Sequence, residues 1–167
     1  MKIVGIDPGL AATGIAVIEG TGLSVARYAY GCIHTSARDD MPIRLNRIYN
    51  RLTSFLKEQS PDFIVVEDVF SLDRFPKSGI ILGKVTGVIL LAGCQLNLTV
   101  KEIPVRAAKQ ILTGNGSAGK KQLAESVKHR LNHPGPIRPY HAADAIALAM
   151  IGLFRHSNTI GDCVRFA

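Results

Sequence analysis

Tryptophan is absent from this chain of 167 residues, and cysteine is scarce. The three cysteines, Cys32, Cys94 and Cys163, are odd in number and lie far apart. This spacing excludes both a disulfide framework and a zinc site of the C-x-x-C type, so we expect three reduced thiols. The chain is long enough to bury roughly 70% of its unfolded surface around one core, and it needs no disulfides to fold.

Long uncharged segments, internal repeats and low-complexity linkers are also lacking. The longest stretch without a charge, Val85–Val100, contains four polar residues and falls short of the roughly 18 apolar residues of a membrane span. No small-residue cleavage site follows the apolar run after Lys2, so a signal peptide is not expected. We therefore predict a cytoplasmic protein with no membrane segment, made of one domain over residues 1–156 and a C-terminal tail over residues 157–167.

Acidic residues are few: 13 Asp and Glu stand against 20 Lys and Arg, which gives a net charge of +7. Most of the excess lies between Lys101 and Arg138, where eight bases accompany only Glu102 and Glu125. The eight bases are Lys101, Arg106, Lys109, Lys120, Lys121, Lys128, Arg130 and Arg138. Such a segment suits a phosphate backbone, but on charge alone a solvated face without a partner is equally compatible.

The first third of the chain predicts strands followed by a helix. Three β-rich segments punctuated by glycine, Lys2–Asp7, Thr13–Glu19 and Ser24–Ile33, indicate antiparallel neighbours joined by tight turns. Between Pro42 and Glu58, apolar residues recur every three or four positions with arginines between them, which is typical of an amphipathic helix.

The rest of the chain alternates strands and helices. Phe63–Glu67 and Thr99–Ile103 are predicted as strands, and Ser78–Leu98 is apolar nearly all round, so it predicts a helix buried in the domain or in an oligomer interface. A strand reached through a helix is most simply parallel to an earlier strand. Further helices are expected over residues 104–113, Lys120–Leu131 and Ala142–Arg155. The predicted fold class is α/β, with a mixed five-stranded sheet, antiparallel over its first three strands and parallel later, flanked by helices.

Two acids close apolar strands. Asp7 ends the first strand and Glu67 the fourth, and in α/β sheets reactive groups gather beyond the carboxyl ends of strands. Adjacent strands lie roughly 4.8 Å apart, so two ionised carboxylates there would repel each other unless a cation intervened. Oxygen ligands favour a hard cation such as Mg²⁺ or Mn²⁺. Either acid alone could equally well only terminate its strand.

A histidine and a third acid share one face of the last helix. His141 and Asp144 stand at positions i and i+3 in its first turn, within an otherwise Ala- and Ile-rich sequence. Singly, His141 could contact solvent and Asp144 could interact with the helix dipole. Together they are typical of a ligand pair directed at a metal ion.

Five blocks in order resemble the bacterial Holliday-junction resolvases of the RuvC family, in the RNase H-like superfamily. They are Ile-Asp-Pro-Gly-Leu at 6–10 with Thr-Gly at 13–14, Val-Val-Glu at 65–67 followed by Phe70, Leu-Gly at 82–83, Gly-Asn-Gly-Ser-Ala-Gly-Lys at 114–120, and Ala-Ala-Asp-Ala at 142–145. The resemblance covers residues 1–156.

The resemblance implies an RNase H-like fold and a metal-dependent endonuclease acting in recombination and DNA repair. A quartet of Asp7, Glu67, His141 and Asp144 would bind two Mg²⁺ or Mn²⁺ ions, which clamp the scissile phosphate while a bound water attacks. The substrate would be a four-way DNA junction and the enzyme a symmetric homodimer, which nicks two opposed strands. RuvA and RuvB, the branch-migration motor, would be its partners.

The resemblance also implies DNA contacts. Phe70 would stack on a base at the junction centre, with Phe75 as a second aromatic. The expected polar contacts are Arg74, Lys77, Lys84, Lys109, Ser117, Lys120 and Lys121. Without the resemblance, Phe70 would be predicted as a core residue, and the lysines as solvated.

Two segments depart from the family pattern. Many members carry a carboxylate where this chain has His141, and the softer imidazole predicts that Mn²⁺ supports turnover relatively better than Mg²⁺. The segment after Glu67 lacks the usual run of Ala, Asn and Ser, and the spacing to Leu82 is about one residue longer.

The glycine-rich loop leaves other functions open. Residues 114–120 match the first seven positions of a P-loop, but Lys121 stands where Ser or Thr would hold Mg²⁺ and a helix is expected before the loop. Ser117 could cap the helix that follows, whose first amides could accept a phosphate. The alternatives are a nuclease of RNase H-like fold acting on another branched or RNA-containing substrate, a junction-binding module without catalysis, and a nucleotide-binding ATPase.

Overall fold

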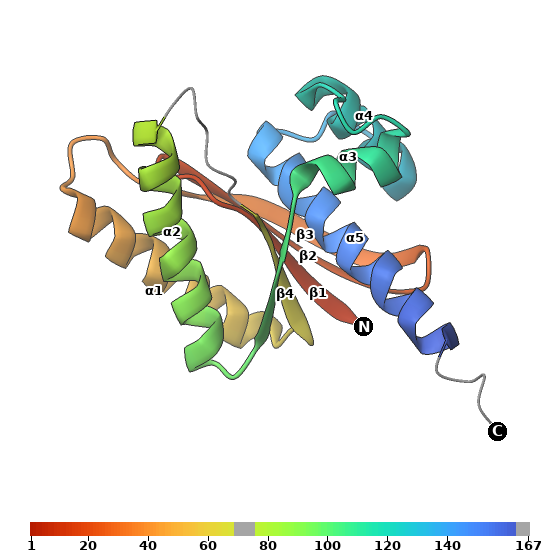
Figure 1. Cartoon of the computed structure of the whole chain (residues 1–167), viewed down its shortest axis with the longest axis horizontal. Coiled ribbons are helices and arrows are strands. Elements are labelled where there is room, and N and C mark those ends of the chain that lie inside the picture. The colour runs from red at the N-terminus through yellow and green to blue at the C-terminus, as the bar shows by residue number, and fades with distance from the viewer. Residues whose placement is uncertain (69–75, 163–167) are drawn as a thin grey trace.

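The computed structural model describes residues 1–68 and 76–162 (Figure 1). The elements in chain order are β1 (Lys2–Asp7), β2 (Ala12–Thr21), β3 (Ser24–His34), α1 (Met41–Gln59), β4 (Phe63–Glu67), α2 (Pro76–Gln95), β5 (Thr99–Ile103), α3 (Val105–Thr113), α4 (Lys120–Leu131) and α5 (Tyr140–Asp162). The α/β class and the order of elements predicted from the sequence are confirmed.

The five strands form one mixed sheet in the order β3-β2-β1-β4-β5. β1 and β2 pair antiparallel, as do β2 and β3, whereas β4 is parallel to both β1 and β5. The sheet is therefore antiparallel over its first three strands and parallel later, as predicted. Because β1 and β4 are neighbours and run in the same direction, their carboxyl ends lie at the same edge of the sheet.

Successive side chains of each strand point to opposite faces of the sheet, and each face has its own hydrophobic core. Ile3 faces a core shared with α3, α4 and α5, whereas Val4 and Ile6 face a core shared with α1 and α2. Figure 1 shows the sheet between these two groups of helices. Asp7 follows Ile6 and so points to the α5 side, which makes the α5 face the one that carries the site.

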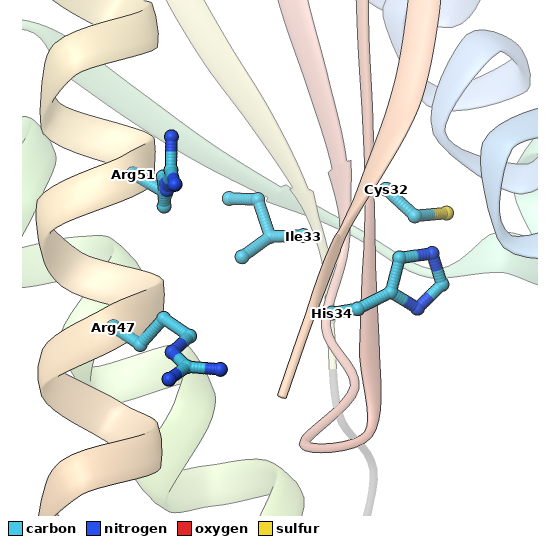
Figure 2. A pocket seen from close by; sticks show the side chains of 5 residues that line it. All are labelled: Cys32, Ile33, His34, Arg47 and Arg51. Carbon is cyan, nitrogen blue, oxygen red and sulfur yellow. The ribbon is translucent and has the colours of Figure 1, made fainter. Parts of the chain in front are cut away.

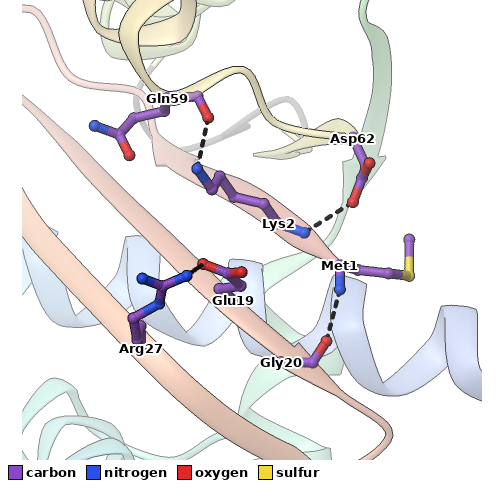
Figure 3. Close-up of polar contacts among 7 residues, drawn as sticks. All are labelled: Met1, Lys2, Glu19, Gly20, Arg27, Gln59 and Asp62. Carbon is purple, nitrogen blue, oxygen red and sulfur yellow. Dashed lines mark hydrogen bonds and ion pairs between the residues drawn. The ribbon is translucent and has the colours of Figure 1, made fainter.

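Polar contacts close the end of the sheet away from Asp7 (Figure 3). The amino group of Met1 donates to the carbonyl of Gly20 at 2.8 Å, and the Lys2 backbone N–H donates to Asp62 Oδ2 at 2.8 Å. Arg27 on β3 forms an ion pair with Glu19 on β2 at 2.8 Å, with 78% of the Arg27 side chain exposed. These groups are satisfied locally and lie far from the carboxyl ends of β1 and β4.

Several element bounds differ from the sequence prediction; α2, for example, spans Pro76–Gln95 rather than Ser78–Leu98. α5 continues to Asp162 instead of ending at Arg155, and no proline or glycine occurs between Arg155 and Gly161 to stop it. The segment 157–162, predicted as tail, is thus helical. Pro104 is the N-cap of α3 rather than its first helical residue, because its ψ of 131° is extended.

The apolar helix α2 is only partly covered. Val85, Ile89 and Ala92 are buried against the α1 side of the sheet, while Ile80 and Leu91 are 62% and 51% exposed. Residues 77–95 are long and apolar enough to cross a membrane by length and composition alone, with a mean hydropathy of 1.5. Core helices of soluble proteins meet the same criterion, and α2 packs against α1 and β5.

Candidate metal centre

The site forms where β1 and β4 end. Asp7 is the last residue of β1 and pairs with Gly14 of β2, while Glu67 is the last residue of the adjacent parallel strand β4. Both side chains point to the α5 face, in alternation with Ile6 and Val66 on the opposite face. The turn after Asp7 is tight, and Thr13 Oγ1 closes it by donating to the carbonyl of Gly9 at 2.8 Å.

Small residues allow α5 to lie directly on the sheet. A Cβ atom on Gly5 would come within 2.0 Å of the Ala145 carbonyl oxygen, and one on Gly14 within 2.1 Å of the His141 carbonyl oxygen. Side chains at either position would push α5 away from β1 and β2. This close approach carries His141 and Asp144, in the first turns of α5, to the carboxyl end of β1.

Three side chains converge at this point. Ligand atoms of Asp7, His141 and Asp144 all lie within 4.8 Å of one another, with Asp7 only 5% and Asp144 only 7% exposed. His141 Nδ1 lies 2.6 Å from Asp7 Oδ2. Glu67 is outside this tight group, but its carboxyl group shares a hydrogen bond with Asp7. Asp7 therefore stands between the His141–Asp144 pair on one side and Glu67 on the other.

The crowded acids resist ionisation. Burial, reinforced by the hydrogen bond to Asp7 and its negative charge, raises the pKa of Glu67 to about 8. Burial and the charge of Asp7 raise the pKa of Asp144 to about 6. The hydrogen bond to Asp7 raises the pKa of His141 above its usual value. Without a metal ion, the protein holds protons where negative charges would repel one another.

These properties fit a divalent cation. Buried carboxylates that retain protons for lack of a counter-charge gain a favourable partner when a dication binds. Carboxylate oxygens suit Mg²⁺ and Mn²⁺, and one imidazole is compatible with Mn²⁺. His141 Nδ1 and Asp7 Oδ2 are both possible metal ligands, but here they are hydrogen-bonded to each other. This hydrogen bond must break before either atom can bind an ion.

Two of the predicted lysines lie beside the cluster. The positive charge of Lys109 on α3 opposes part of the rise in pKa at both Glu67 and Asp144, and that of Lys120 at the start of α4 opposes part of the rise at Asp144. A positive charge acts in this way only over a short distance, so both lysines flank the acids. They are placed to neutralise an anion that approaches the metal site.

The other predicted DNA contacts are not part of the cluster. Lys121 and Ser117 are exposed near the start of α4, and Lys77 and Lys84 are exposed on α2, across the sheet from α5. Phe70, Arg74 and Phe75 lie outside the described residues.

The glycine-rich loop satisfies its own amides. The Gly116 N–H donates to Gln110 Oε1 at 2.9 Å, the Ser117 N–H to Asn115 Oδ1 at 2.9 Å, and the Ala118 N–H to the Asn115 carbonyl at 3.0 Å. The loop follows helix α3 rather than a strand, which contradicts a P-loop. The expected Ser117 cap is wrong, because Gly119 is the N-cap of α4 and no side chain bonds there. Only the first amides of α4 remain available for an anion.

Several basic residues of the 101–138 segment are held against aromatic rings. The Lys101 ammonium lies 4.4 Å from the Phe63 ring centroid, and the Arg138 guanidinium 4.1 Å from that of Tyr140. Such contacts fix cations over the α5 layer while leaving them charged. The segment thus contributes to packing as well as to the positive potential, a role that charge counting does not reveal.

Cys32 is a neighbour of the site that the sequence did not indicate. It pairs with Gly14, which in turn pairs with Asp7, so the three residues form one row across β3, β2 and β1. Burial and the nearby Asp7 charge raise the pKa of the Cys32 thiol. The thiol is therefore kept protonated, and nothing in the sequence spacing could have placed it there.

Comparison with known proteins identifies one family. Residues 3–152 match the profile described as "Crossover junction endodeoxyribonuclease RuvC". Proteins of that name from Yersinia enterocolitica and Yersinia pestis are each 37% identical over 158 residues, which cover 95% of this chain and 90% of theirs.

Solved structures agree with the sequence comparison. Thermus thermophilus RuvC in complex with Holliday junction substrate superposes with a TM-score of 0.86 at 28% identity, covering 95% of this chain and 96% of that one. The yeast mitochondrial Holliday junction resolvase Ydc2 shares the fold, with a TM-score of 0.61 at 11% identity over 97% of this chain and 84% of that one.

Proposed function

The chain belongs to the RuvC family of crossover junction endodeoxyribonucleases, and from this premise we propose that it resolves four-way DNA junctions by metal-dependent hydrolysis of phosphodiester bonds. The observation that carries the proposal is the convergence of Asp7, His141 and Asp144 within 4.8 Å, with Glu67 hydrogen-bonded to Asp7. A module that only binds DNA does not need buried acids with raised pKa values. The cluster therefore supports a catalytic role over binding alone.

Asp7 is the residue that both sides of the site share. Its position supports two ion sites, one with His141 and Asp144 and one with Glu67. Bound divalent ions would supply Lewis-acid activation of the phosphate and of an attacking water. The protein's own contribution is to hold the ligands on β1, β4 and α5 without rearrangement of the backbone, and to direct the charges of Lys109 and Lys120 at the phosphate.

Cleavage assays on three substrates test the proposal. The full chain, incubated with Mn²⁺, is expected to nick a synthetic four-way junction in two opposed strands while leaving a linear duplex and an RNA·DNA hybrid largely intact. EDTA should abolish the reaction, and ATP should not be required. Preferential cutting of the hybrid would instead support another nuclease of this fold, and junction binding without any cutting would support a non-catalytic module.

The preferred ion follows from His141. We expect Mn²⁺ to support a higher rate than Mg²⁺, because imidazole is a softer ligand than carboxylate. His141→Asp should lower the ratio of the Mn²⁺ rate to the Mg²⁺ rate several-fold. Because both rates are measured on the same variant, losses of folding or DNA affinity cancel in the ratio. An unchanged ratio would contradict a direct role of His141 as a ligand.

The proposal also includes a homodimer, further contacts with DNA and partner proteins. A homodimer would present two equivalent sites to the junction, and the exposed Ile80 and Leu91 of α2 offer apolar surface for its interface. Lys109, Lys120 and the exposed Lys121 would contact the cleaved strand, and Phe70 would stack on a base. We place this activity in the cytoplasm, with RuvA and RuvB as the branch-migration partners.

A further inference from the structure

A pocket of about 530 Å³ opens between α1 and β3, at the edge of the sheet. It is lined by Cys32, Ile33, His34, Arg47 and Arg51. Figure 2 shows Arg47 and Arg51 projecting from α1 towards β3, with Ile33 pointing to them, whereas Cys32 and His34 point to the opposite face of the strand. We propose that this pocket binds a backbone phosphate of the DNA substrate, outside the metal centre; the proposal rests on the function proposed above.

The two arginines are arranged as an anion receptor. They lie four residues apart and therefore on one face of α1, and both are exposed. Arg47 reaches one acid, Asp39, at 3.6 Å, with Asp39 Oδ2 making no hydrogen bond. Within residues 1–68 and 76–162, no acid is paired with Arg51. A guanidinium without a carboxylate is well suited to a phosphate, whose oxygens it can bind in bidentate fashion.

The strand edge adds backbone donors. The Thr35 N–H donates to the Ala11 carbonyl at 3.1 Å, so Thr35 and Ala11 form a hydrogen-bonded pair between β3 and the start of β2. Residues alternate along an antiparallel ladder, which turns the N–H and C=O groups of Cys32 and His34 away from β2. β3 is an edge strand, so these N–H groups face the open side, where the pocket lies.

One wall of the pocket lies near the metal centre. The backbone of Cys32 stands in the same row as Asp7, two strands away, or about 10 Å. A nucleic-acid strand covers that distance in about three nucleotides at its axial rise of roughly 3.4 Å. Arg44 Nε donates to Thr35 Oγ1 at 2.8 Å, and Thr35 Oγ1 donates to the carbonyl of Leu10, in the loop after Asp7. DNA held here would extend from the scissile phosphate on the side opposite Lys109 and Lys120.

Salt-dependent binding of the junction tests the pocket. The affinity of the full chain for a four-way junction is measured in EDTA across a series of salt concentrations, for the wild type, Arg51→Gln and the double variant Arg47→Gln/Arg51→Gln. Losing a phosphate contact makes the plot of log affinity against log salt shallower by about one per phosphate. Because both arginines contact one phosphate, we expect a slope shallower by about 1 for the double variant, with affinity lowered roughly tenfold, and a smaller decrease for the single variant, which keeps one guanidinium on the phosphate.

Arg27→Gln is the matched control. It removes the same charge from an exposed arginine of β3 at the far end of the sheet, where Arg27 pairs with Glu19. Its salt slope and its rate of cutting should stay those of the wild type, because Arg27 lies far from both the pocket and the metal centre. Thermal unfolding of each variant checks that it is folded, and Arg51→Gln decides the matter if the double variant is not.

The outcomes separate this inference from the function on which it rests. If the wild type neither binds nor cuts the junction, the proposed function fails. If the wild type does both, and the double variant has the same salt slope as Arg27→Gln, then only the phosphate pocket is overturned.

Discussion

Replacing Asp7 by Asn should lower the rate of junction cleavage at least about a thousandfold while leaving junction binding intact. The reason is its central position, since Asp7 contacts His141 at 2.6 Å and shares a hydrogen bond with Glu67. An amide keeps the shape of the side chain but removes the charge that holds a cation on both sides of the site. Affinity for the junction should be equal or slightly higher, because one negative charge near the DNA phosphates is lost.

Cleavage under single-turnover conditions and binding in EDTA measure the two effects separately. Asp40→Asn is the matched control: the same change is made at an exposed aspartate whose side chain makes no cap bond to α1. It should leave both quantities unchanged. Retention of more than a tenth of the wild-type rate by Asp7→Asn would mean that the metal ions are held elsewhere, and the proposed catalytic role of this cluster would be wrong.

Periodicity and turn residues sufficed to predict most of the fold. β1, β4, β5 and α4 begin and end where the sequence predicted, because apolar runs and proline or glycine positions mark their limits clearly. The sequence indicated that Asp7 and Glu67 would be neighbours if their strands were adjacent, and the strand order supplies that adjacency. The length of α5 was underestimated because no proline or glycine between Arg155 and Gly161 marks an end, and the apolar periodicity alone does not show where the helix stops.

Tertiary contacts between distant segments were not predictable in the same way. Nothing in the spacing of residues places Cys32 in the row of Asp7 or predicts a pocket with Arg47 and Arg51, because both depend on strand register and on where α1 packs. The arginines of α1 stand between the apolar residues of an amphipathic helix, a pattern that indicates no binding site by itself. In the glycine-rich loop, the partner of the Gly116 amide is the side chain of Gln110, a residue outside the motif that motif matching ignores.

The second large effect concerns stability, which we expect to fall as pH rises from about 5 to about 8 when no metal is bound. The folded-state pKa of Glu67 is about 8 against an ordinary 4.5, and that of Asp144 about 6 against 3.8. The pKa of His141 is also raised. A raised pKa means that the folded protein binds more protons than the unfolded chain, so this stability is present below the ordinary pKa and is lost as pH passes the folded-state value.

The three groups act in the same direction, and the combined loss in the free energy of unfolding should be on the order of 3 kcal/mol. Urea unfolding in EDTA at several pH values measures it. Mn²⁺ should restore most of the stability at pH 8 and little at pH 5, because ligands must lose their protons to bind the ion.

Asp7→Asn provides the internal control for this effect. Part of the shift at Glu67 and at Asp144 comes from the charge of Asp7, so the variant should lose less stability than the wild type between pH 5 and 8 in EDTA. It should also respond less to Mn²⁺, since a shared ligand is gone. One substitution would then abolish cleavage and make the metal-free protein more stable at alkaline pH, which is the behaviour expected when acids are crowded to hold a cation rather than to support the fold. If the stability of the wild type stays level or rises between pH 5 and 8 in EDTA, then ionising these acids does not destabilise the folded protein, and this interpretation is wrong.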